Sequence, residues 1–111
     1  MEKTIKLGDK EILLKATAMN LIIYQEAFGE DMFKAKGELL DAMGKDGIQF
    51  EKIPSATLLK MLWTMARTGD RNFPSFREWV DSLDELPVVE LYNENINLFL
   101  ANMVQKSDIK N

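Results

Sequence analysis

The chain has no histidine and no cysteine among its 111 residues, and each absence excludes a kind of chemistry. A chain without cysteine has no disulfides, no thiolate metal sites and no thiol nucleophile. A chain without histidine lacks the usual general base near neutral pH and the commonest metal ligand. An enzyme of this composition would have to use carboxylates, lysines or hydroxyls alone. We therefore expect a protein that is not an enzyme and that uses no metal and no cofactor.

Long apolar runs are absent as well. No run approaches the ~20 residues that a membrane-spanning helix needs, and Met1-Glu2-Lys3 leads into a predicted strand rather than a signal peptide. The formal net charge of -4 argues against a surface that binds phosphates. The 46% of hydrophobic and 29% of charged residues are those of an ordinary globular domain. We expect a cytoplasmic protein of one domain that binds another protein, and neither nucleic acid nor a membrane.

Two short strands open the chain, and we expect them to form a β-hairpin over residues 3–16. Ile5 and Leu7 alternate with lysines, and Ile12 and Leu14 alternate with Leu13 and Lys15, which is the period of a half-buried strand. Gly8-Asp9-Lys10 lies between the strands as the turn. One possible register pairs Leu7 with Ile12 and Ile5 with Leu14. The other has a loop of only two residues and pairs Leu7 with Lys10. We favour the first register, because apolar pairs across strands each add roughly 0.2 to 1 kcal/mol.

A helix is expected over residues 18–28. Thr17 has the chemistry of an N-cap, and Gly29 suits the left-handed position that ends a helix. Apolar residues within these limits cover more than one stripe: Met19, Leu21, Ile22, Ile23, Tyr24, Ala27 and Phe28. A helix with one buried side needs only a single stripe. We therefore expect this helix to be central to the core or shared with a neighbouring subunit.

Four further helices are predicted, over residues 30–43, 55–68, 75–86 and 88–106. Ser75 and Glu78 form a capping box at the start of the third of these. Residues 44–47 are a loop, and 48–53 are either more loop or a brief extended segment. The pattern predicts one globular domain over residues 1–106, with a flexible tail at 107–111. The fold class is α+β and mainly α, with an N-terminal β-hairpin packed on a bundle of four to five helices.

Two motifs have ordinary structural interpretations. Asp81, Asp84 and Glu85 could form a metal site or an acid-base pair, but such a cluster on an amphipathic helix is usually its solvated face. The helices over 55–68 and 75–86 could form a helix-turn-helix that reads DNA. The second of them carries Arg77 against four carboxylates, which phosphate would repel. A DNA-binding protein and a carboxylate-only enzyme are therefore the weaker alternatives.

The order of these motifs resembles that of a known protein family. Two strands joined by a glycine-containing turn lead through Lys15-Ala16-Thr17-Ala18 into an apolar helix that ends Glu26-Ala27-Phe28-Gly29-Glu30-Asp31. A helix rich in leucine, with a tryptophan, closes at Gly69-Asp70 and is followed by Ser75-Phe76-Arg77-Glu78-Trp79-Val80. Over most of its length the chain resembles the tail assembly chaperones of long-tailed (siphovirus-type) phages and prophages of Gram-positive bacteria.

This resemblance implies a function that composition cannot show. Such chaperones bind and protect the aggregation-prone tape measure protein in the cytoplasm of the host bacterium, help recruit tail-tube subunits around it, and are absent from the mature virion. Many are made in two lengths by a ribosomal frameshift, and the longer form recruits the tail-tube protein. This chain resembles the short form, in which the slip would fall near Lys106 or Lys110.

A chaperone that coats a long, mostly helical partner needs many copies and an adaptable apolar surface. We therefore expect a homo-oligomer whose first and last helices present a surface for the partner or for self-association. The predicted residues are Leu21, Tyr24 and Phe28 of the first helix, and Tyr92, Ile96, Phe99 and Met103 of the last, where they form a seam at steps of three and four. The alternative is another small interaction protein, such as an adaptor or an antitoxin-like subunit.

Overall fold

A computed structural model describes residues 1–100 of the chain. Within that range the fold is α+β and mainly α, with an N-terminal antiparallel hairpin and five α-helices, which confirms the predicted fold class. The predicted end of the last helix and the predicted tail lie outside the described residues. The elements, in chain order, are β1 (Glu2–Leu7), β2 (Lys10–Lys15), α1 (Met19–Phe28), α2 (Met32–Asp41), β3 (Met43–Gly44), β4 (Gly47–Ile48), the 3-10 helix η1 (Phe50–Lys52), α3 (Ser55–Gly69), α4 (Phe76–Asp81) and α5 (Val88–Leu100).

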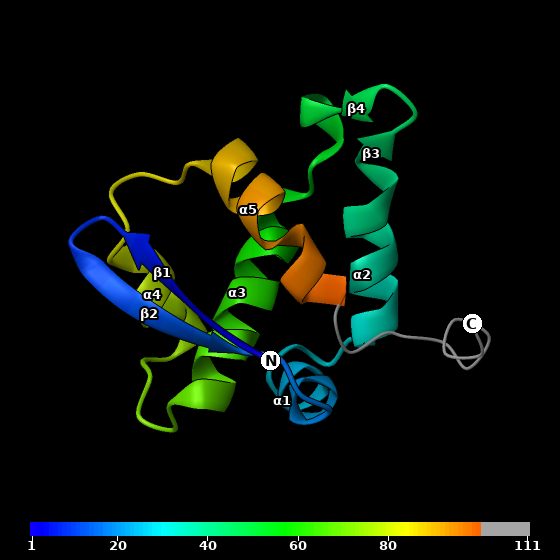
Figure 1. Ribbon diagram of the computed structural model, residues 1–111. Helices are drawn as coiled ribbons and strands as arrows, with labels where there is room; N and C mark the ends of the chain where they lie inside the picture. The colour runs from blue at the N-terminus through cyan, green and yellow to red at the C-terminus, as the bar shows by residue number, and fades with distance from the viewer. Residues whose placement is uncertain (101–111) are drawn as a thin grey trace.

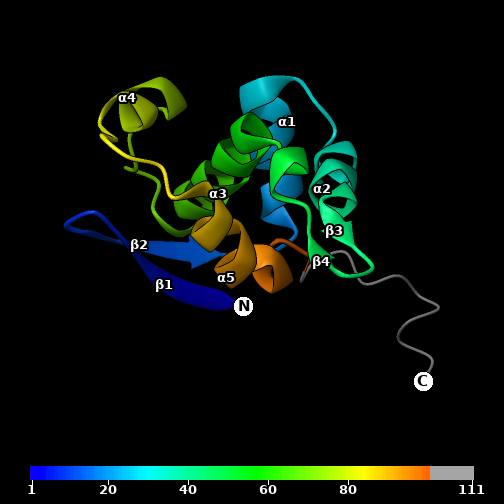
Figure 2. The same ribbon diagram turned by 90° about the horizontal axis from the view of Figure 1, so that it is seen from above.

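Helix α3 is the centre of the fold. It contacts β2, α1, α2, α4 and α5, and it runs between the hairpin on one side and α2 on the other (Figures 1 and 2). Its buried residues lie on almost every side of the helix: Leu58, Met61, Leu62, Trp63, Thr64, Met65 and Ala66. A helix that is buried on most sides must be enclosed by its neighbours. The central position that we considered for the helix over 18–28 therefore belongs to α3.

The hairpin adopts the register that we did not favour, so that prediction was wrong. Ile5 pairs with Ile12 and Leu7 with Lys10, which leaves a loop of two residues. The two registers differ by two residues, and because side chains alternate with a period of two, the same residues face the core in both. Alternation cannot choose between them. The turn does, because Gly8 has a φ of 66°, the positive value needed at the first position of a type II′ loop.

The described residues share one hydrophobic core. The hairpin contributes Ile5, Leu7, Ile12 and Leu14, and α5 contributes Leu91, Tyr92, Ile96, Leu98 and Phe99. Between α2 and α5, the Tyr92 hydroxyl donates a hydrogen bond to the carbonyl oxygen of Leu39. Within the described residues, the seam predicted in the last helix, which consists there of Tyr92, Ile96 and Phe99, faces inward.

Both ends of α1 are closed by the residues that the sequence indicated. The Thr17 hydroxyl accepts a hydrogen bond from the amide of Met19 at 3.2 Å, although α1 begins at Met19, one residue later than predicted, after Ala18, whose backbone is already helical. In return, the Asn20 side-chain oxygen accepts from the amide of Thr17 at 3.1 Å, which completes a reciprocal cap like a capping box. At the other end Gly29 is left-handed, with a φ of 64°, and its amide donates to the Gln25 carbonyl oxygen.

Asn20 also joins α1 to two other elements. Its side chain is fully buried, and its Nδ2 donates to the carbonyl oxygen of Lys15 at 3.0 Å and to Oγ1 of Thr68 at 2.7 Å. One carboxamide therefore connects the end of β2, the start of α1 and the last turn of α3. A buried amide group must be satisfied in this way, because an unpaired one costs about 1 to 3 kcal/mol.

Helix α4 begins as predicted but ends early. The Ser75 hydroxyl caps it by accepting from the amide of Glu78 at 3.2 Å. It ends at Asp81 instead of residue 86, where the Ser82 hydroxyl donates to the carbonyl oxygen of Trp79 at 2.6 Å and competes with a further turn. With six residues, α4 is short for a helix that would read a DNA groove.

Helix α2 is shorter than predicted at both ends. It begins at Met32 instead of residue 30, because the Asp31 carboxylate caps it by accepting from the amide of Phe33 at 2.9 Å. It ends at Asp41, and β3 and β4 then pair as a miniature hairpin before η1. Residues 44–53, predicted as loop with a possible extended piece, therefore contain brief strands and one 3-10 turn.

A buried lysine lies on α2 beside this core. Lys36 is fully buried, and its burial lowers the pKa of its ammonium group to about 8. In an unfolded chain a lysine has its ordinary pKa of 10.5. The folded state therefore binds a proton less tightly here than the unfolded state does.

We predict that Asn20→Ala lowers the free energy of unfolding by about 2 to 4 kcal/mol, because one backbone amide, one backbone carbonyl and one hydroxyl lose the same buried partner. Urea denaturation followed by circular dichroism measures the change. Asn93→Ala, at an exposed position of α5, is the control and should stay within about 0.5 kcal/mol of the unchanged protein. Equal stability of the two variants would contradict the connecting role of Asn20.

We predict that Lys36→Met removes a dependence of stability on pH. Below pH 8 Lys36 is protonated in both the folded and the unfolded protein, so the folded protein carries the full free-energy cost of burying a charged ammonium group. Between pH 8 and 10.5 only the unfolded state holds the proton, so the unchanged protein gains stability as the pH rises. The advantage of Lys36→Met over the unchanged protein should shrink by about 1 to 3 kcal/mol between neutral pH and the upper end of this window.

The control for this measurement is Lys34→Met, on the exposed side of the same helix. Its stability difference from the unchanged protein should be the same at both pH values. A difference for Lys36→Met that also stays constant with pH would show that burial does not shift this group.

Candidate partner-binding site

Most of the residues predicted to form the partner surface are part of the core. Tyr24, Tyr92 and Phe99 are at most 1% exposed, and Ile96 is 7% exposed. In this conformation a partner cannot reach them, so their prediction as surface residues is corrected. The reason is that an inward seam and a subunit contact have the same spacing in the sequence. Met103 lies outside the described residues.

Leu21 and Phe28 are partly buried, and Phe28 holds the end of α1 in place. Its ring meets those of Tyr24, Trp63 and Phe76 edge to face, at centroid distances of 5.0, 5.5 and 5.1 Å. Lys60 of α3 lies with its Nζ 5.3 Å from the centre of the same ring. Such aromatic pairs add about 0.5 to 1.5 kcal/mol beyond their buried area. Phe28 is therefore a packing residue that fixes α1 on α3 and α4.

The electrostatics around this cluster follow from burial and one ion pair. Burial, with smaller contributions from the charges of Glu30 and Glu38, raises the pKa of Tyr24 to about 12. Lys60 Nζ lies 2.6 Å from a carboxylate oxygen of Glu30, and this hydrogen bond lowers the pKa of Glu30. Tyr24 is therefore neutral at physiological pH.

A groove between α1 and α3 is the best candidate for a partner site. This α1–α3 groove has a volume of about 620 Å³ and is lined by Met19, Ile23, Glu26, Ala27, Trp63, Arg67, Thr68 and Arg71. Met19 and, beside it, Ile22 are each 51% exposed. Leu21, Ile23 and Phe28 of α1 pack against the core, so only part of the apolar surplus predicted for this helix, Met19 and Ile22, faces outward.

The outward residues of α1 form one continuous face. Met19, Ile22, Ile23 and Glu26 follow the spacing i, i+3, i+4 and i+7, which places them on one side of a helix. The other wall of the groove is fixed by α3. There the Arg67 guanidinium lies 5.9 Å from the Trp63 ring and donates to the carbonyl oxygen of Phe73.

Opposite charges lie at the two ends of the groove. The start of α1 lies at the end of α3, as the bond from Asn20 to Thr68 shows, and the end of α1 lies at the middle of α3, where Phe28 meets Trp63. Arg71 follows α3 and is therefore at the Met19 end. Along the axis of α1, Glu26 lies about 10 Å from Met19, because seven residues separate them and each adds 1.5 Å. Both side chains are exposed.

A second exposed apolar feature lies on α2. Phe33 and Leu40 are 51% and 44% exposed, and Gly37 lies between them at the spacing i, i+4, i+7. A Cβ atom at Gly37 would meet no atom within 4 Å, so this side of α2 is open. We name Phe33, Gly37 and Leu40 the α2 stripe. It is flat, whereas the α1–α3 groove has two walls.

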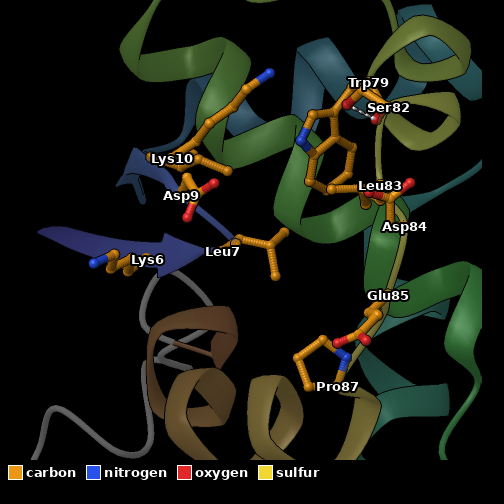
Figure 3. A pocket seen from close by; sticks show the side chains of 12 residues that line it. Lys6, Leu7, Asp9, Lys10, Trp79, Ser82, Leu83, Asp84, Glu85 and Pro87 are labelled. Carbon is orange, nitrogen blue, oxygen red and sulfur yellow. Dashed lines mark hydrogen bonds between the residues drawn. The ribbon is translucent and has the colours of Figure 1, made fainter.

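A second cavity, of about 460 Å³, lies between the hairpin turn and the α4–α5 connection (Figure 3). Lys6, Asp9 and Lys10 line it from the hairpin, and Asp84 and Glu85 from the connection opposite. Acidic and basic side chains therefore line this cavity together with Trp79. Asp81 does not line this cavity, and nowhere in residues 1–100 do three or more Asp or Glu residues lie close enough to hold a metal ion.

Comparisons with known proteins identify no relative of this chain. No protein-family model, no curated protein and no solved structure matches it. Over residues 1–100, no helix is both long and apolar enough to span a membrane.

Sequence reasoning found the apolar surplus of α1 but missed the residues that turn it outward. Asn20 stands three residues after the Thr17 cap, where a capping box has Glu or Gln, and that spacing was the available signal. Arg71 had no signal of its own, because it lies in a turn whose position depends on the packing of α3.

Proposed function

We propose that this chain is a tail assembly chaperone, which binds helical segments of a tape measure protein through the α1–α3 groove. The observation that carries the proposal is the outward apolar face of α1, above a groove walled by Trp63 and Arg67. A helix that lays its apolar face into such a groove is a recurrent mode of recognition. The resemblance of the motif order to tail assembly chaperones supports the choice of a tape measure protein as this partner.

The properties of the groove suit a chaperone that meets many similar segments. Met19 is flexible and polarizable, so it adapts to different side chains. The ten residues of α1 extend about 15 Å, which matches roughly three turns of a partner helix. A long helical protein would therefore need many copies of the chaperone to cover it.

Recruitment of tail-tube subunits completes the proposal. It is assigned to a frameshifted longer form, in which an extension follows the chain described here. The protein acts in the host cytoplasm and is absent from the mature virion. Binding an apolar helix in this groove forms and breaks no covalent bond, so the proposed function is non-enzymatic.

We predict that the double variant Met19→Lys, Ile22→Lys loses binding to the tape measure protein. Two lysines on the outward face would place charges against an apolar segment of the partner. The amount of tape measure protein captured should therefore fall roughly tenfold or more. The measurement is co-expression with the tape measure protein of the same phage, followed by affinity capture and the soluble yield of that protein.

The matched control is Phe33→Lys, Leu40→Lys on the α2 stripe, which exchanges two apolar side chains of similar exposure on a helix for lysines. It should retain binding, and circular dichroism should show both variants folded. Loss of binding only in the α2 variant would move the site to the α2 stripe. Absence of binding by the unchanged protein would refute the chaperone function and favour an adaptor or antitoxin-like protein.

A further inference from the structure

The α1–α3 groove is self-complementary under a two-fold rotation. Its outward face runs from Met19 to Glu26, and the midpoint of that stretch falls between Ile22 and Ile23. An antiparallel copy of α1 placed on this face would therefore bring Ile22 onto Ile23 of the second copy. The same placement brings Glu26 to the Met19 end of the second copy, which is the end where Arg71 lies.

We propose that the free protein forms a symmetric dimer in which each α1 lies antiparallel on the α1–α3 groove of the other copy. Glu26 of each copy pairs with Arg71 of the other, so the dimer contains two such contacts. The apolar centre, with Met19, Ile22 and Ile23, is buried between them. Closed two-fold interfaces of this kind are the commonest arrangement of soluble oligomers.

Charge complementarity selects a second copy as the occupant. Two copies of a chain with a net charge of -4 repel one another at most orientations. The groove presents one acidic and one basic side chain at opposite ends, and an antiparallel copy presents the same two in reverse order. Arg67 also lines the groove, but its guanidinium is held in place on its own chain by Trp63 and the Phe73 carbonyl oxygen, so Arg71 is the basic group assigned to Glu26 of the second copy.

The dimer goes beyond the proposed function and does not depend on it. Where the chain does act as a tail assembly chaperone, the second copy and the helical partner compete for one groove. The dimer would then cover the apolar face until the partner displaces the second copy.

Charge reversal tests the dimer with the full chain alone. The variants are Glu26→Arg and Arg71→Glu, both at exposed positions, and sedimentation equilibrium measures the dissociation constant of each. Each variant alone should dissociate roughly tenfold to a hundredfold more readily, because two attractive contacts per dimer become repulsive. An equimolar mixture of the two variants should associate as tightly as the unchanged protein, since every Arg then faces a Glu.

Matched controls carry the same charge changes away from the groove. Glu51→Arg on η1 and Lys45→Glu in the β3–β4 turn should leave the dissociation constant unchanged. A monomeric unchanged protein, or a dimer that neither reversal weakens, would overturn the proposal. Weakening without recovery in the mixture would overturn it too. No tape measure protein is present in this test, so a negative result leaves the chaperone function standing.

Discussion

The hydrogen bonds of Asn20 decide which way α1 faces, and the surface of the molecule follows from that choice. The apolar residues of α1 lie on all sides of the helix, so burial of apolar area alone does not favour one rotation of this helix over another. Asn20 removes the ambiguity, because its carboxamide must lie between β2 and α3 to be satisfied. Tyr24, one turn on, then points inward, and Met19 and Ile22 are left on the outside.

Helix α3 makes this orientation rigid. Its buried residues face five neighbouring elements, and the groove is formed where its outer side meets α1. At one end α1 is tied by Asn20 to Thr68, and at the other by Phe28 to Trp63 and Phe76. A helix held at both ends presents its middle as a fixed surface, which lowers the entropic cost of binding a partner. The groove is therefore preformed by the same contacts that stabilise the core.

The sequence was most informative where a local rule has one outcome. The cap at Thr17, the left-handed Gly29 and the cap at Ser75 depend on neighbours within a few residues, and they were predicted correctly. The hairpin register was not, because both candidates bury the same side chains and the turn geometry at Gly8 decided between them. The inward seam of α5 could not be told from an interface, since the two share one spacing. Only the packing against α2 and α3 distinguishes them.

The fold does not require apolar residues on the outside of α1. Lysine or glutamate would form this helix as well as methionine and better than isoleucine, and either would keep the surface more soluble. At Met19 and Ile22 the chain instead carries side chains that are half exposed and that stabilise little in the monomer. Exposed apolar side chains promote association, and a proposed role in binding a partner gives a reason for their presence. Because an acidic and a basic residue bound this apolar stretch, the proposed association would be directional rather than non-specific.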